Sequence, residues 1–249
     1  MRAVLAALAL LLAAPALAEP PRASVRPEAR PAAPVQRAPS TSAPRTSQQP
    51  AARPGGFGAA PRGGSGGGDG RGRAVRYANT VCGLPDVAGV PVQRIPGRLP
   101  GCGVEDPVRV AAVAGVALDR PAVMNCRTAK ALRDWVAGGV VPAFARMGEV
   151  ASLKVAAGYT CRTRNNRPGG RISEHGRGAA IDVSAFRLAD GREVTVLEGW
   201  RALSTRAAVQ GAWRAACGPF GTVLGPNADR YHRDHLHLDT ASRRSAYCR

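Results

Sequence analysis

The chain has 249 residues, a formal net charge of +18 and only 4% aromatic residues. Almost all of its positive charge is arginine, since Lys130 and Lys154 are the only lysines, and no basic motif is interleaved with aromatic side chains. This pattern argues against a nucleic-acid-binding protein and favours a polyanionic envelope surface as the partner of the charge.

The chain begins with one arginine and a short apolar run, and the small-residue motif Ala16-Leu17-Ala18 precedes Glu19. These features predict a signal peptide over residues 1–18 that is cleaved after Ala18, because the run is shorter than the ~20 apolar residues of a membrane-spanning helix. No later segment has that length and apolarity. We therefore expect a periplasmic or secreted protein without a stable membrane span.

Residues 19–76 are rich in Pro, Gly, Ser and Arg and have no hydrophobic periodicity. Such a segment cannot bury enough apolar surface to offset its chain entropy, so it is predicted to be a disordered linker. It would serve as a spacer, or as a basic tether on an anionic surface. The remaining residues, 77–249, have the length of one domain.

All six cysteines lie in this domain, and none forms a C-x-x-C pair. An even number in an exported protein predicts disulfides, whereas the wide and irregular spacing argues against a cysteine-zinc site. The sequence leaves the pairing open and offers one local guess, Cys82 with Cys102, because they flank a short Gly/Pro-rich stretch. The other cysteines are Cys126, Cys161, Cys217 and Cys248.

The domain opens with a turn-rich stretch over residues 81–103 and an extended ribbon or strand pair over 106–118. A helix is predicted over 128–148, with Thr128 as its N-cap and Gly138-Gly139 and Pro142 as points of bending or interruption. The later elements are strands at 152–162, 178–186, 193–200 and 234–240 and a helix that begins at 204 and closes at Gly218. This mixed order predicts an α+β fold, a single domain with a mainly antiparallel sheet flanked by helices and stabilised by disulfides.

The last predicted strand holds two of the chain's four histidines at alternating positions. Since side chains alternate between the faces of a strand, Leu236 and Leu238 would face the core, and His235, His237 and Asp239 would face the other way.

The strand over residues 178–186 has the same alternation. Ile181 and Val183 would face the core, which leaves Asp182 on the opposite face. If this strand neighbours the last one, Asp182 and His237 converge, and His175 in the preceding glycine-rich loop can join them.

Two neutral imidazoles and a carboxylate are suitable ligands for Zn²⁺, the expected cofactor. Three protein ligands with a fourth position for water form the pattern of a catalytic site, which activates water for hydrolysis. His235 would lie close enough to transfer protons. Gly176 and Gly178 would let the loop turn tightly and let substrate approach the metal.

These residues also carry a family resemblance. The pattern S-x-H-x-x-G-x-A-x-D, from Ser173 to Asp182, is followed by H-x-H at His235 and His237. It resembles the zinc D-Ala-D-Ala metallopeptidases, grouped with lysostaphin and the hedgehog signalling domain, over about residues 150–240. The cysteine-bearing domain behind a Pro-rich region, about 77–249, also resembles the bacterial extensin-like C-terminal domain.

The peptidase resemblance implies that His175, Asp182 and His237 bind zinc and that His235 assists proton transfer or stabilises the transition state. Some relatives place a Glu three residues before the last ligand as the general base. Asp234 stands there in this chain and is the second choice, because a regular strand would point it away from the metal.

Relatives also carry an Arg shortly after a Gly-Tyr pair, where it meets a substrate carbonyl or carboxylate. In GYTCRTRN the equivalent is Arg162, with Arg164 as the runner-up. Ser173 has two open roles, a hydrogen bond to substrate or a cap of the loop. Asp239 could orient an imidazole, and His232 is expected outside the metal shell, on the surface.

Location, site chemistry and resemblance together predict an exported zinc peptidase that hydrolyses amide bonds near D-amino acids in peptidoglycan stem peptides or cross-links. Folds of this kind also serve as non-catalytic modules, so the alternative is a cell-wall-binding or structural envelope protein. Peptidoglycan is the expected partner in both cases. Carboxypeptidase and endopeptidase action both stay open, as does the oligomeric state.

Overall fold

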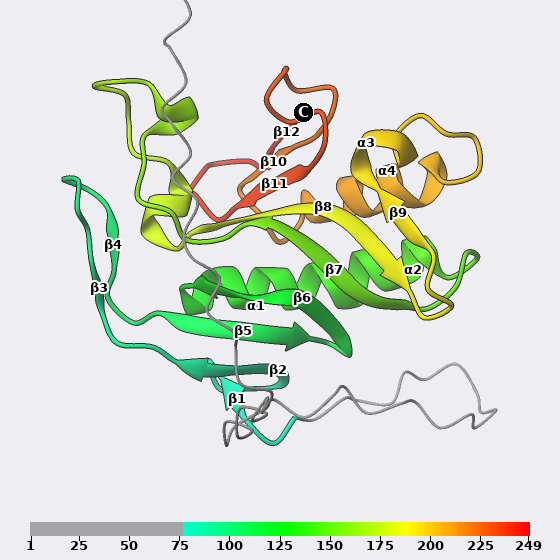
Figure 1. The fold of residues 1–249 in the computed structure, drawn as a ribbon, viewed down its shortest axis with the longest axis horizontal. Helices are drawn as coiled ribbons and strands as arrows, with labels where there is room; N and C mark the ends of the chain where they lie inside the picture. Colours follow the sequence, from blue (N-terminus) through cyan, green and yellow to red (C-terminus); the bar gives the residue numbers. More distant parts are fainter. Residues whose placement is uncertain (1–76) are drawn as a thin grey trace, which may run out of the picture. The chain divides into compact units, whose positions relative to one another are not determined.

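A computed structural model describes residues 77–249, so the predicted signal peptide (1–18) and linker (19–76) lie outside the described residues. Within 77–249, ten strands form one sheet in the order β1-β2-β5-β6-β7-β8-β11-β10-β12, with β9 paired to β8 (Figure 1). Neighbouring strands in this sheet are antiparallel, except for the β6–β7 and β10–β12 pairs, which are parallel. The predicted α+β fold with a mainly antiparallel sheet is confirmed.

The strands of the large sheet are β1 (Thr80–Val81), β2 (Leu84–Pro91), β5 (Val108–Val113), β6 (Val116–Met124), β7 (Val150–Ala157), β8 (Ala180–Leu188), β9 (Glu193–Thr195), β10 (Thr222–Leu224), β11 (Leu236–Asp239) and β12 (Tyr247–Cys248). A separate ribbon pairs β3 (Ile95–Pro96) with β4 (Gly103–Val104). The helical elements are α1 (Cys126–Trp135), the π-helical turn η1 (Val136–Val140), α2 (Val141–Phe144), the 3₁₀ turns η2 (Arg164–Asn166) and η3 (Glu174–Arg177), α3 (Val196–Gly199) and α4 (Arg206–Ala216).

Several predicted boundaries are corrected by local hydrogen bonding. Helix α1 starts earlier than expected, because the Asn125 side chain accepts a hydrogen bond from the backbone N–H of Thr128 at 2.8 Å, so Asn125 and not Thr128 is the N-cap. The strand predicted over 193–200 ends at Thr195, whose hydroxyl caps α3 by accepting from the N–H of Glu198. The stretch predicted as turn-rich contains the eight-residue strand β2.

The predicted interruption of the first helix takes the form of the π-helical turn η1 between α1 and α2. Gly139 is required there, since a Cβ atom would lie 2.7 Å from the Cβ of Ala215. Trp135, fully buried at the start of this turn, donates its indole N–H to the carbonyl of Ala212 in α4 and meets Phe186 and Phe220 edge-on. The π-helical turn therefore packs directly against α4.

Strands β8 and β11 are antiparallel neighbours with His237 opposite Asp182. Ile181, Val183, Leu236 and Leu238 are fully buried in the core. The predicted alternation is confirmed, and Asp182 and His237 lie on the sheet face that points away from the core.

The six cysteines form three disulfides, Cys82–Cys126, Cys102–Cys161 and Cys217–Cys248. The guess of a local Cys82–Cys102 bridge is wrong, because Cys82 lies beside the start of α1 whereas Cys102 reaches the segment that follows β7. Each bridge joins segments 31 to 59 residues apart and so restricts the unfolded chain. No helix within residues 77–249 has the length and apolarity needed to cross a bilayer.

Gly178 provides a test of how the fold holds the segment that carries His175. Its φ is +62°, and an added Cβ would lie 2.8 Å from a methyl group of Val104. We expect Gly178→Ala to lower the free energy of unfolding by about 1 to 3 kcal/mol. Gly138 is the control: it is exposed with nothing within 4 Å of an added Cβ, so Gly138→Ala should stabilise by roughly 0.5–1 kcal/mol. Chemical denaturation measures both, and equal effects would contradict this account.

Candidate metal centre

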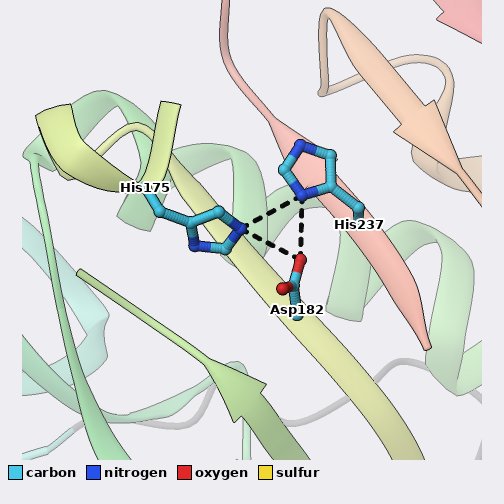
Figure 2. A group of neighbouring side chains, drawn as sticks. All are labelled: His175, Asp182 and His237. Carbon is cyan, nitrogen blue, oxygen red and sulfur yellow. Dashed lines mark hydrogen bonds and ion pairs between the residues drawn. The ribbon is translucent and has the colours of Figure 1, made fainter. Parts of the chain in front are cut away.

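Three side chains from distant parts of the sequence meet on the face of β8 and β11 that points away from the core. Nε2 of His175 lies 3.1 Å from Oδ1 of Asp182 and 3.1 Å from Nδ1 of His237, and the last two atoms are 2.8 Å apart. Figure 2 shows the three groups pointing toward one another from η3, β8 and β11. The structure therefore brings together the three residues predicted to bind zinc.

The outer nitrogen of each imidazole is already engaged. Nδ1 of His175 contacts the carbonyl oxygen of Gly158 at 2.9 Å, and Nε2 of His237 contacts Oδ2 of Asp239 at 3.2 Å. On the inner side, Nε2 of His175 and Nδ1 of His237 both face the carboxylate oxygen Oδ1 of Asp182. When the ring protons lie on the outer nitrogens, which can donate to Gly158 and Asp239, both inner nitrogens present lone pairs that a cation can bind together with Asp182.

The donor set and its spacing suit zinc. In a tetrahedral site with bonds of about 2.0–2.1 Å, neighbouring ligand atoms lie about 3.3 Å apart. The distances of 2.8 to 3.1 Å in this triangle need only a slight expansion. Two nitrogens and one carboxylate oxygen match the ligand types of catalytic zinc sites, which keep one position open.

The pKa values of His237 and Asp182 are shifted in the directions that favour a positive charge at this site. Burial lowers the pKa of His237, but its hydrogen bonds with Asp182 and Asp239 outweigh burial and raise the pKa to about 9. Burial raises the pKa of Asp182, but hydrogen bonds with His175 and His237 outweigh it and hold the pKa well below its usual range. Without a metal, a proton on His237 supplies the charge, and a metal ion would replace that proton.

The turn that carries His175 is fixed by close packing. Gly178 ends η3 in the left-handed conformation, and a Cβ on Gly176 would lie 2.9 Å from Sγ of Cys102. Glu174, with an 8% exposed surface, accepts from Arg164 at 3.2 Å and from Arg177 at 3.3 Å. The expectation that the glycines admit substrate is wrong, since both are buried against other segments and serve packing.

His235 lies beside this triangle. Its Nε2 is 3.7 Å from Oδ2 of Asp182, and its Nδ1 donates to Oδ1 of Asp234 at 2.8 Å. Strand β11 begins only at Leu236, so Asp234 lies before the strand, and the alternation of side chains between the two faces does not fix its direction. Its side chain is 68% exposed and orients His235. Of the two residues considered for proton transfer, His235 is the one that approaches the candidate metal ligands.

The loop after β7 places Arg162, Arg164 and Ser173 on the wall of a cavity of about 500 Å³ that also contains the three candidate ligands. Arg164 is held by Glu174, whereas within residues 77–249 the guanidinium of Arg162 hydrogen-bonds only to the carbonyl of Thr163, at 3.4 Å. Of these two arginines, Arg162 is the one available to a ligand. Ser173 stands at the N-cap position of η3, but its hydroxyl makes no capping hydrogen bond, which disfavours the capping role.

Sequence reasoning missed part of this cavity wall. His232 was expected on the surface, but its side chain is only 13% exposed and its ring centroid lies 5.7 Å from that of His237. Nδ1 of His232 donates to Asp229 at 2.8 Å, and the acid three residues before the histidine was an available signal for this pair. Arg243 and Tyr247 also line the cavity, and no sequence pattern pointed to them.

The comparisons with known proteins give one match. The model of the family described as "Extensin-like protein C-terminus" matches residues 86–249, which include every candidate site residue named above. No curated protein and no solved structure matches the chain.

The three-atom convergence predicts one zinc ion per chain after dialysis against zinc and removal of the excess. His175→Ala and Asp182→Ala should each abolish this stoichiometric binding, because two ligands cannot hold the ion against solvent. His232→Ala is the control and should keep the metal, since His232 lies outside the triangle. Elemental analysis measures the content, and retention of zinc by the Asp182 variant would contradict the assignment.

A substitution of Asp239 tests whether its hydrogen bond to Nε2 of His237 contributes to metal binding. Asp239→Asn should weaken zinc binding about 10- to 100-fold, because the amide fixes the orientation and protonation of His237 less firmly than the carboxylate. Asp234→Asn makes the same chemical change beside His235 and should leave zinc affinity unchanged. Competition with a chromogenic chelator measures both affinities, and equal losses would count against a specific role for Asp239.

Proposed function

The chain belongs to the extensin-like protein C-terminus family, and from its candidate metal centre we propose that it is an exported zinc-dependent peptidase. Its substrates are amide bonds near D-amino acids in peptidoglycan stem peptides or cross-links. The resemblance of the two histidine motifs to the zinc D-Ala-D-Ala metallopeptidases, which the family match does not by itself establish, supports this activity.

One observation carries the proposal. Three candidate ligand atoms converge on the wall of a cavity, with His235 next to them. A purely structural zinc site uses four protein ligands and is closed to solvent. When bound at a three-ligand site, zinc polarises a substrate carbonyl and makes a water molecule acidic enough to react at neutral pH.

The chain's own residues supply the remaining functions. His235 is oriented by Asp234 and presents Nε2 toward the ligand triangle, where it can accept a proton from water and later donate it to the leaving amine. Arg162, with no acidic partner within residues 77–249, can bind a carbonyl or carboxylate of the substrate. Glu174 and Arg164 keep the loop that carries both Ser173 and His175 in place.

The proposed location is the periplasm or the cell exterior. Three disulfides within the described part of the chain are typical of exported proteins. Cleavage of the signal peptide after Ala18 and attachment through the linker of residues 19–76 belong to the same proposal. The large positive charge suits a negatively charged cell envelope.

Incubation with purified muropeptides tests the activity. We expect new amines or free D-alanine to form with zinc, to disappear with a chelator and to return when zinc is added back. His235→Ala should lower kcat by about 10²- to 10⁴-fold while the zinc content stays the same, because proton transfer is lost and the ligands are not.

The rival reading, a wall-binding module without turnover, gives a different pattern. The protein would then sediment with peptidoglycan, release no product under any metal condition, and be indifferent to the loss of His235. That combination would reject the peptidase.

A further inference from the structure

Three arginines line the cavity, and they differ in their partners. Arg164 forms an ion pair with the buried Glu174. Neither Arg162 nor Arg243 makes an ion pair with any acidic side chain in residues 77–249. Two guanidinium groups therefore stand on the wall of the cavity with their charge uncompensated by the described protein.

Arg243 is held in place although its side chain reaches solvent. Its Nε donates to the hydroxyl of Thr222 at 2.8 Å, and its guanidinium carbon lies 5.6 Å from the centre of the Tyr247 ring. Since Nε is engaged, the two terminal amino groups remain as donors. Such a pair of parallel N–H groups matches the two oxygens of a carboxylate.

The two arginines reach the cavity from different parts of the fold. Arg162 follows β7, and Thr222, which anchors Arg243, lies in β10. Between these strands in the sheet are β8 with Asp182 and β11 with His237. Both arginines line the same cavity as these two ligands.

We propose that this cavity binds a peptide through two carboxylates, one at Arg162 and a second at Arg243, so that the backbone between them passes over His175, Asp182 and His237. A stem peptide has two such acids, a free C-terminal carboxylate and the free α-carboxylate of a γ-linked D-glutamate three residues earlier. The proposal rests on the peptidase function and names Arg243 as the residue that selects the distal acid.

Two labelled peptides that differ in one group test the subsite. The first is L-Ala-γ-D-Glu-L-Lys-D-Ala-D-Ala, and the second carries D-isoglutamine, the amide, in place of the D-glutamate acid. Fluorescence anisotropy at physiological salt, with zinc and again with a chelator, gives the Kd of each peptide for the full chain. We expect the protein to bind the acid about tenfold more tightly than the amide, and Arg243→Gln to remove this preference.

Arg244→Gln is the matched control, since it removes the same charge from the adjacent exposed arginine, which does not line the cavity. It should keep the preference for the acid. Three results would overturn the subsite: an unchanged preference in the Arg243 variant, an equal loss for both peptides, which would indicate a structural role through Thr222, or no binding of either peptide to the wild-type protein.

Hydrolysis of the same two peptides, followed by chromatography, separates this proposal from the function on which it rests. An acid preference that depends on Arg243 without any cleavage would support the subsite and reject the peptidase. Cleavage at equal rates, with equal affinity for acid and amide, would support the peptidase and reject the subsite.

Discussion

Three atoms with lone pairs, held 2.8 to 3.1 Å from one another, are the constraint on which the candidate site depends. When the ring protons of both imidazoles lie on the outer nitrogens, toward the Gly158 carbonyl and Asp239, the three inner atoms all present lone pairs to one another. Such an arrangement is unfavourable unless a cation or a proton lies between them. The raised pKa of His237 and the suitability of the site for zinc have the same cause, because both a proton and a metal ion place positive charge beside Asp182.

The fold imposes this constraint by holding each ligand rigidly. Asp182 and His237 are opposite one another in a hydrogen-bonded strand pair whose alternate residues are buried in the core, so neither strand can slip without exposing Ile181 or Leu238. His175 lies in a short turn packed against the Cys102–Cys161 disulfide. The packing of the core therefore stabilises the positions of His175, Asp182 and His237, whose polar groups lie close together.

The sequence was sufficient for the part of the site that depends on alternation. A period of two residues in each strand places Asp182 and His237 on one face, and this follows from local chemistry alone. The pairing of Cys82 with Cys126 and the burial of His232 depend on which segments meet in three dimensions, and a single sequence does not carry that information. The choice between Arg162 and Arg164 also required the structure, since it turns on the ion pair with Glu174. The sequence did not indicate Arg243 as a site residue, because it reaches the cavity only through the order of the strands in the sheet.

The most direct test of the central claim is a crystal structure of the zinc-loaded protein, with anomalous diffraction recorded on both sides of the zinc absorption edge. The account predicts one strong anomalous peak about 2.0–2.1 Å from Nε2 of His175, Oδ1 of Asp182 and Nδ1 of His237, with Gly158 and Asp239 still bonded to the outer nitrogens. A triangle without a peak, or a zinc ion bound elsewhere while these three side chains point apart, would contradict it.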